Sequence, residues 1–405
     1  MSDKFFCVAP FVHLYAHTTG EVKTCCVGNT TYGSLKEKTI EEIWHSDEYK
    51  KLRRDFIAGE ITPELAKNCS TCINFENSNI HSLREGLNDE FKAFAEIDEN
   101  ADVNLLYMDF RFNNFCNFKC RGCYHEYSSS IHNEDKGSSQ DLIFAGKTEE
   151  DLFDQVYPYL PDAQKIYFAG GEPLIQWEHW KILDRLEELN RTDMKLVYNT
   201  NFSTMKYKQR HITEYWKKFS DVKLLLSLDG MEKGAEYWRN GTKWNQLVKN
   251  IKKVKKETPH VYMGVTCTVG WANLYTAMDF IDYCADSANP NDVDDFEFLD
   301  PVRININVLE QPIHFSTQSV PDWKKEELEK RIRKTYDKYI SMGFEDDSLL
   351  ARNLVALIDF MWAKEGDSRR IKGGWDQIVT RRDELRGENF FEAFPEHINM
   401  KEIIE

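Results

Sequence analysis

Short apolar stretches alternate with longer segments of helical periodicity from about residue 103 onward. This alternation is typical of a parallel sheet built from successive βα units. It predicts six strands, at Leu105–Arg111, Lys165–Ala169, Lys195–Asn199, Val222–Leu228, Val261–Thr268 and Arg303–Leu309. Helical patterns separate the strands, for example over Trp177–Leu189 and Trp244–Lys256. We therefore expect an α/β fold, a partial (β/α)6 TIM-like barrel whose working residues gather at the carboxyl ends of the strands.

The two ends of the chain have other patterns. The first hundred residues are irregular at first and then show helical patterns near 39–57 and 80–97. Beyond about residue 320 the chain is helical again, over Trp323–Met342, Leu349–Lys364 and Asp376–Arg386. A polar stretch at 128–141 is expected to form a mobile loop. These patterns predict three domains: a small cysteine-rich domain over 1–100, the barrel over 101–315 and a C-terminal helical extension over 316–405.

Composition and charge narrow the class of protein. The 405 residues are 41% apolar and 30% charged, as in globular proteins with a sizeable core. The formal charge of −16 argues against affinity for nucleic-acid phosphate or an anionic membrane. No apolar run approaches the roughly 18 residues of a membrane span, and we expect the opening FFCVAPFVHLYA to be mature sequence. Eight of the ten cysteines lie within the first 123 positions, which indicates metal binding in a reducing compartment, the cytoplasm.

Three cysteines directly follow the first predicted strand, in the segment CNFKCRGC. Cys116, Cys120 and Cys123 have the spacing CxxxCxxC. A [4Fe-4S] cluster held by only three thiolates keeps one iron open to an exogenous ligand, which redox chemistry on a bound substrate requires. A structural zinc site usually has a fourth ligand, which His125 could supply, so this motif alone leaves both metals open.

The second predicted strand ends in a glycine pair followed by a carboxylate, in IYFAGGEPL. Gly170 and Gly171 would let the backbone approach a ligand closely, and Glu172 could accept hydrogen bonds from an ammonium group. The same tetrapeptide is also an ordinary turn. Together with the cysteine motif, it favours a site for an amino acid end.

Four further segments lie at the expected strand ends: YNTN at 198–201, SLDG at 227–230, YWRNGTKW at 237–244 and VTCTV at 265–269. With these motifs the chain resembles the radical S-adenosylmethionine (SAM) superfamily over about 103–310. The resemblance implies that a [4Fe-4S] cluster on Cys116, Cys120 and Cys123 binds the amino and carboxylate groups of SAM. One electron then cleaves SAM into methionine and a 5′-deoxyadenosyl radical, which abstracts hydrogen from substrate.

The same resemblance implies roles for the residues around the cofactor. Gly170, Gly171 and Glu172 would hold the methionine amino group. Ser227 and Asp229 would face the cofactor, and Arg239 would pair with its carboxylate. Asn199 and Asn201 would lie on the ribose side or, equally, cap turns. Because Gly122 stands where the family often has an aromatic residue, with Tyr124 just after Cys123, the adenine contact stays unassigned.

Five further cysteines offer thiols for one more site near the N-terminus. Gly20 and Cys25 give the G-x4-C element of the SPASM and twitch accessory domains of radical SAM enzymes, which commonly follow the barrel and here precede it. The resemblance implies an auxiliary [4Fe-4S] cluster on Cys7, Cys25, Cys69 and Cys72, with Cys26 as the surplus thiol. A zinc site with four thiolates is the alternative.

Other residues carry less specific expectations. Strand alternation would direct Tyr107, Asp109 and Arg111 to one side of the first strand, and Arg303, Asn305 and Asn307 to one side of the sixth. They could meet substrate, or they could be paired with one another, so we name no acid or base catalyst. Cys267 and Cys284 are expected to be buried hydrophobes.

The sequence thus predicts a cytoplasmic radical SAM oxidoreductase with two [4Fe-4S] clusters. We expect a peptide or protein side chain as the substrate that is oxidised or cross-linked, and a reductant such as flavodoxin or ferredoxin as a partner. One alternative is a radical SAM dehydrogenase, epimerase or isomerase that acts on a sugar, nucleotide or other small molecule. Another is a non-catalytic iron-sulfur or zinc protein that transfers electrons or scaffolds a partner.

Overall fold

The computed structural model of the chain describes residues 5–77, 81–94, 104–137, 142–289, 292–296 and 298–404. These residues form two compact units. The first unit comprises Met1–Cys116, His125–Tyr198 and Glu214–Val222, and the second comprises Asn117–Tyr124, Asn199–Thr213 and Lys223–Glu405. The chain passes between the two units several times.

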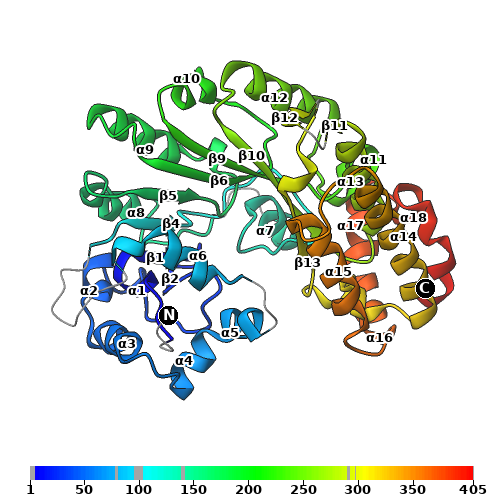
Figure 1. The fold of residues 1–405 in the computed structure, drawn as a ribbon, viewed down its shortest axis with the longest axis horizontal. Helices are drawn as coiled ribbons and strands as arrows, with labels where there is room; N and C mark the ends of the chain where they lie inside the picture. The colour runs from blue at the N-terminus through cyan, green and yellow to red at the C-terminus, as the bar shows by residue number, and fades with distance from the viewer. Residues whose placement is uncertain are drawn as a thin grey trace. The chain divides into compact units, whose positions relative to one another are not determined.

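A nine-stranded sheet organises the fold (Figure 1). Its strand order is β13-β10-β9-β6-β5-β4-β1-β2-β3, where the strands are β1 (His13–Ala16), β2 (Glu21–Lys23), β3 (Gly33–Ser34), β4 (Tyr107–Phe110), β5 (Lys165–Phe168), β6 (Lys195–Thr200), β9 (Asp221–Ser227), β10 (Tyr262–Val269) and β13 (Ile304–Val308). Strand β4 pairs in parallel with β5, β5 with β6, β9 with β10 and β10 with β13. The six predicted strands are therefore confirmed, and the mostly parallel sheet is that of a partial TIM-like barrel. Two small sheets pair β7 (Lys206–Tyr207) with β8 (Arg210–His211) and β11 (Ala288–Asn289) with β12 (Asp292–Phe296).

Helices connect and follow the strands. Up to β6 they are α1 (Ala9–Val12), α2 (Ile40–Trp44), α3 (Asp47–Ala58), α4 (Pro63–Asn68), α5 (Ser70–Asn77), α6 (Leu83–Glu90), α7 (Ser129–Lys136), α8 (Asp151–Val156) and α9 (Trp177–Glu188). After β6 they are α10 (Ile212–Trp216), α11 (Glu232–Trp238), α12 (Trp244–Glu257), α13 (Leu274–Asp286), α14 (Asp322–Ser341), α15 (Leu349–Trp362), α16 (Arg369–Gly374), α17 (Arg381–Arg386), α18 (Phe390–Ala393) and α19 (Lys401–Ile404). Short 3-10 turns lie at Lys92–Phe94, Tyr157–Tyr159, Pro173–Ile175, Pro301–Arg303, Ile313–Phe315, Thr317–Ser319 and Pro395–Met400, and the π-helix η7 covers Trp375–Thr380.

Local sequence explains where the N-terminal helices begin. The predicted pattern near 39–57 is two helices, because Thr39 caps α2 in a capping box and Ser46 caps α3 through its hydroxyl. Gly59, with a φ of 76°, ends α3 in the left-handed conformation that glycine adopts without strain. The pattern near 80–97 is α6 followed by a 3-10 turn, and its last residues lie outside the described ranges.

Two expectations were wrong. The segment predicted as irregular holds α1 and strands β1 to β3, and β1 pairs in parallel with β4 through His13 to Ala16, all of them buried. Its strands have only two to four residues, too few for alternation to show. The predicted loop at 128–141 contains α7, which the Ser128 hydroxyl caps and Gly137 ends, while 138–141 lie outside the described residues. Its low apolar content hid the helix.

The core of the first unit gathers side chains from the cysteine-rich segment and from β4. It includes Val8, Phe11, Phe56, Leu87 and Leu106. In the second unit, Cys267 on β10 and Cys284 on α13 are fully buried, as predicted for hydrophobic thiols. Among the described residues, no helix is both long and apolar enough to span a membrane.

Candidate cluster and cofactor sites

Four of the five N-terminal cysteines surround one cavity in the first unit. Cys7, Cys25, Cys69 and Cys72 line one small cavity, together with apolar side chains such as Phe56. Cys26 is exposed and does not line this cavity. The structure thus brings together the four thiols that the sequence singled out and leaves the fifth outside.

A turn and two helices position these thiols. Cys69 ends α4 and Cys72 lies in α5, and this i, i+3 spacing places both on one side of the chain. Asn68, the last residue of α4, connects Cys69 to the turn around Cys25. Its Nδ2 donates to Thr24 Oγ1 at 3.4 Å, and its Oδ1 accepts from Thr30 N at 3.0 Å. Side-chain hydrogen bonds as well as packing therefore position these cysteines.

Burial and neighbouring thiols disfavour the ionisation of Cys7, Cys25 and Cys69. Burial and the neighbouring thiols raise the pKa of Cys25 to about 12, and burial and Cys72 raise that of Cys69 to about 12. Burial and Cys25 also raise the pKa of Cys7 well above its ordinary value. Thiolates at such positions need a metal to balance their charge, so the donor set fits an iron-sulfur cluster. Within the described ranges, no three His, Cys, Asp or Glu side chains form a group that could hold a single metal ion.

The three-cysteine loop starts in the first unit, where Cys116 follows β4. The N-terminus of α7 fixes its backbone, because Cys116 N donates to Ser129 Oγ at 3.2 Å and the Ser130 hydroxyl donates to Cys116 O at 2.7 Å. These two serines lie in the stretch that was predicted to be a loop. Their signal was the SSS run preceding a helix.

The glycine pair lies beside the same backbone in the first unit. A Cβ on Gly171 would lie only 2.0 Å from Phe115 O, and Gly170 has a φ of +117°. Glu172 N donates to Phe115 O at 2.8 Å, and its buried carboxylate caps the following 3-10 turn by accepting from Leu174 N at 3.1 Å. The turn therefore requires glycine because two backbone segments pass in close contact.

The rest of the loop lies in the second unit. Burial raises the pKa of the Cys120 thiol, while Arg239 opposes this shift, and Arg239 Nη1 lies 3.9 Å from Cys120 Sγ. Burial and Cys120 raise the pKa of Cys123 to about 12, and Arg239 and Arg382 again oppose the shift. Cations beside buried thiols favour thiolates, so this donor set also fits a cluster.

Asp229 positions Arg239. Its Oδ2 lies 2.7 Å from Arg239 Nε, and its Oδ1 accepts from Thr268 N at 2.7 Å. Asp229 is 3% exposed, so both carboxylate oxygens are engaged within the protein. The structure thus assigns Asp229 a contact with Arg239 rather than a free oxygen for the cofactor.

The polar residues at the ends of β6 and β9 contact one another in the second unit. Ser227 Oγ donates to Asn199 Oδ1 at 3.2 Å. Asn201 Oδ1 accepts from Ser203 N at 3.0 Å, and its Nδ2 donates to Asn117 Oδ1 at 3.1 Å. Asn201 therefore caps a turn and also contacts the cysteine loop at Asn117.

The polar side chains expected along the first and sixth strands are mutually paired. Arg111 Nη2 lies 3.0 Å from Asp109 Oδ1, and burial raises the pKa of Asp109 to about 6 despite this partner. Asn305 Nδ2 donates to Asn307 Oδ1 at 3.0 Å, and Arg303 pairs with Asp300. Tyr107 stacks on His13 in the core of the first unit. None of these contacts identifies an acid or base.

Comparison with known families decides the class of this protein. Residues 110–272 match the radical SAM superfamily, and residues 7–73 match SPASM, an iron-sulfur cluster-binding domain. The chain thus has a radical SAM domain and a SPASM-type domain, which are the domain types that hold a [4Fe-4S] cluster with SAM and an auxiliary cluster. The expectation of both cofactor types is therefore confirmed.

Solved structures similar to this radical SAM enzyme include anSMEcpe with bound AdoMet, at 17% identity and a TM-score of 0.38. They also include Streptococcus suis SuiB bound to S-adenosylmethionine, at 12% identity and a TM-score of 0.36. The first comparison covers 58% of this chain and 58% of the other, and the second covers 68% and 60%. The chain thus matches less than two thirds of the length of either structure. No curated protein matches it.

Proposed function

We propose that this radical SAM enzyme cleaves SAM reductively and uses the resulting radical to oxidise or cross-link a peptide or protein side chain. Cys116, Cys120 and Cys123 hold the SAM-binding cluster, and Cys7, Cys25, Cys69 and Cys72 hold the auxiliary cluster. When bound and reduced, the first cluster supplies the electron that splits the sulfonium of SAM, and the 5′-deoxyadenosyl radical then takes a hydrogen atom from substrate.

The protein's own groups bind and orient the cofactor. Gly170 and Gly171 expose backbone to the amino group, and Glu172 keeps the turn in shape and lends its negative charge. The Arg239 fork, held by Asp229, offers its remaining N–H groups to the carboxylate of SAM. Ser227 and Asn199 form a polar pair that would face the cofactor, with Asn201 as a weaker ribose contact. These assignments rest on the family resemblance and on the contacts described above.

The four thiols around one cavity are the observation that carries the oxidative part of the proposal. Four cysteine ligands saturate a cubane, so the auxiliary cluster has no open iron for substrate and suits electron transfer or structural support. An electron acceptor inside the protein lets a substrate radical lose its second electron, which is net oxidation. The SPASM-type domain supports a peptide substrate, since this domain resembles those of enzymes that often tailor peptides.

The reaction also needs a source of single electrons and a reducing environment. We propose a carrier such as flavodoxin or ferredoxin as the reductant. The ten cysteines all lie in the described residues and none forms a disulfide, which suits the cytoplasm.

Anaerobic reduction with dithionite tests the proposal. The iron-replete protein should contain about eight irons per chain and convert SAM to 5′-deoxyadenosine, and Cys120→Ala should lose about four irons and all cleavage. A protein with about four irons and one zinc would exclude the auxiliary cluster. Cleavage that is absent from the parent, or unchanged by Cys120→Ala, would contradict the activity itself.

The substrate class needs a separate measurement. SAM labelled with deuterium at the 5′ position is incubated with a cell-derived peptide fraction or with the small-molecule fraction from the same cells. We expect faster 5′-deoxyadenosine formation and a mass change in a peptide. Stimulation by the small-molecule fraction alone would favour a sugar, nucleotide or other small substrate instead.

A further inference from the structure

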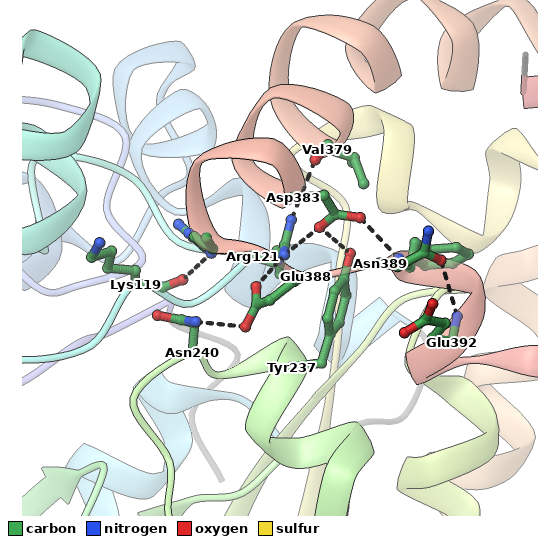
Figure 2. A network of polar contacts seen from close by, with 11 residues as sticks. Lys119, Arg121, Tyr237, Asn240, Val379, Asp383, Glu388, Asn389 and Glu392 are labelled. Atoms are coloured by element: carbon green, nitrogen blue, oxygen red, sulfur yellow. Dashed lines mark hydrogen bonds and ion pairs between the residues drawn. The ribbon is translucent and has the colours of Figure 1, made fainter.

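Arg121 occupies an unusual place between two cysteines of the three-cysteine loop. It lies directly after Cys120 and two residues before Cys123, yet its side chain is only 1% exposed. Its Nη2 atom lies 2.5 Å from Asp383 Oδ1 and 2.6 Å from Glu388 Oε2 (Figure 2). Its guanidinium also lies over the ring of Tyr237, 4.1 Å from the ring centre. One buried cation in the loop thus holds two carboxylates from the C-terminal part of the second unit.

The carboxylates that contact Arg121 have their remaining oxygens occupied. The Tyr237 hydroxyl donates to Asp383 Oδ1 at 2.9 Å, and Phe390 N donates to Asp383 Oδ2 at 2.8 Å. Asn240 Nδ2 donates to Glu388 Oε1 at 2.7 Å. A buried polar network of this kind resists rearrangement, because moving one partner leaves another charged group unpaired.

The same neighbours fix the backbone on both sides of Cys120. Lys119 N donates to Asn240 O at 2.8 Å, and Lys119 O accepts from Arg386 Nη1 at 3.0 Å. Arg121 N donates to Trp238 O at 2.8 Å. The peptide groups that flank Cys120 are therefore anchored to segment 237–240 and to α17, and the position of its sulfur depends on both.

These anchors come from parts of the chain that motif reasoning did not connect with the cysteines. Val379, Asp383, Arg386 and Glu388 follow the last residue that matches the radical SAM superfamily, residue 272, by more than a hundred positions. Ion pairs and hydrogen bonds therefore link segment 379–390 to the loop.

We propose that segment 379–390 acts as a clamp on the cluster-binding loop, and that Arg121 is the positioning residue through which it acts. The inference rests on the proposed function, since it assumes that Cys120 and Cys123 hold the SAM-binding cluster. Groups that orient metal ligands typically change metal affinity by about 10- to 100-fold when they are removed. The clamp keeps the Cys120 sulfur in the geometry that retains the cluster.

Chelator-driven iron release from the holoenzyme tests the clamp. Arg121→Gln should release the SAM-binding cluster about 10-fold faster than the parent, or more, and alter the SAM-induced change in the EPR spectrum of the reduced protein. That spectral change reports the three-cysteine cluster, because the saturated auxiliary cluster has no open iron. The release rate and the spectrum are both independent of turnover.

Two further variants keep the result interpretable. Arg331 pairs with both Asp279 and Asp282, at 2.6 and 3.0 Å, and so offers a matched cation between two carboxylates. Arg331→Gln should leave iron release unchanged. If Arg121→Gln does not fold, the neutral triple variant Arg121→Gln, Asp383→Asn, Glu388→Gln removes the ion pairs without leaving buried carboxylates, and it should show the same faster release.

The outcomes separate the two proposals. Parent-like release and spectra in every folded Arg121 variant would overturn the clamp, while a parent that loses about four irons on Cys120→Ala would still support the proposed function. If Arg331→Gln speeds iron release as much as Arg121→Gln does, the faster release reflects a general loss of stability, and the clamp would also be overturned. A parent whose iron content does not respond to Cys120→Ala would contradict the proposed function itself.

Discussion

The two cysteine sites of this protein are built by different forces. The N-terminal cavity is lined by four thiols and by apolar side chains, and the cation at its wall, Arg84, is paired with Glu76 at 2.6 Å. The three-cysteine loop lies among cations in the second unit, where Arg239, Arg382 and Arg386 oppose the effect of burial on its thiols. Packing thus encloses the site proposed for the auxiliary cluster, whereas charge surrounds the site proposed to bind the carboxylate of SAM.

The largest expected effect separates adjacent cysteines. Cys25→Ser should lose about four irons and all conversion of substrate, because it removes a ligand from the cavity, whereas Cys26→Ser should keep about eight irons. Iron analysis with electronic absorption spectra checks both variants. Parent-like iron in Cys25→Ser, or loss of iron in Cys26→Ser, would show that the wrong thiol has been assigned.

The next effect tests the charge around the loop. Arg239→Gln should weaken SAM binding by about 10- to 100-fold, because a hydrogen bond to a charged group contributes roughly 1.5–3 kcal/mol. Isothermal titration of the anaerobic holoprotein measures the affinity. Arg239→Lys keeps the positive charge but lacks the planar guanidinium, so its affinity for SAM should lie between that of the parent and that of Arg239→Gln.

Iron content distinguishes the causes of weaker binding. If Arg239 acts on the SAM carboxylate, Arg239→Gln should retain the iron of the parent. If Arg239→Gln binds SAM as tightly as the parent does, Arg239 does not contact the cofactor and serves only as the partner of buried Asp229.

A smaller effect tests packing at the cavity. Phe56 is 1% exposed and lines the cavity, so Phe56→Ala should lower the free energy of unfolding by about 3–5 kcal/mol and speed the release of auxiliary iron. Phe280→Ala on α13 is the control, because it removes an equally buried ring in the second unit. Chemical denaturation and chelation of the same samples measure both quantities. If the two variants release auxiliary iron at the same rate, packing at the cavity does not retain the cluster.

The sequence predicted the parts of the fold and of the sites that rest on local pattern. The six strands follow from alternation and length, which neighbouring residues determine, whereas the choice of the cavity cysteines follows from the resemblance to SPASM and twitch domains. Strand β1 was missed because its burial depends on pairing with β4, which lies about ninety residues away. Its apolar run carried no periodicity to separate strand from helix.

The contacts of Arg121 and Asp229 were missed for the same reason. An Arg between two ligand cysteines was the available signal, but its partners Asp383 and Glu388 are separated from it by more than 250 positions. Asp229 was expected to face the cofactor, and only the fold shows that its oxygens are taken by Arg239 and Thr268. Side-chain partners across long separations depend on tertiary structure, which a single sequence does not encode in its spacing.

The smallest expected effect concerns a carboxyl group under the glycine turn of the first unit. Asn113 Nδ2 donates to Glu178 Oε1 at 2.8 Å, and Asn113 Oδ1 accepts from Phe115 N at 2.8 Å. Burial raises the pKa of Glu178 from its ordinary 4.5 to about 7. Between these two pH values the folded protein still holds a proton that the unfolded chain has released. Protonated Glu178 therefore contributes its full stability below about pH 4.5, and this contribution is lost as the pH rises through about 7.

Glu178→Gln removes this pH dependence, because the amide stays neutral and its oxygen can still accept from Asn113. The difference in unfolding free energy between variant and parent should grow by roughly 2–3 kcal/mol from about pH 5 to about pH 8.5, in favour of the variant. Denaturation at both pH values measures it, and comparing variant with parent cancels the titration of other groups. A difference that does not change with pH would mean that Glu178 is ionised in the folded protein. The glycine turn would then be supported by a charged network, as the cysteine loop is, instead of a neutral one.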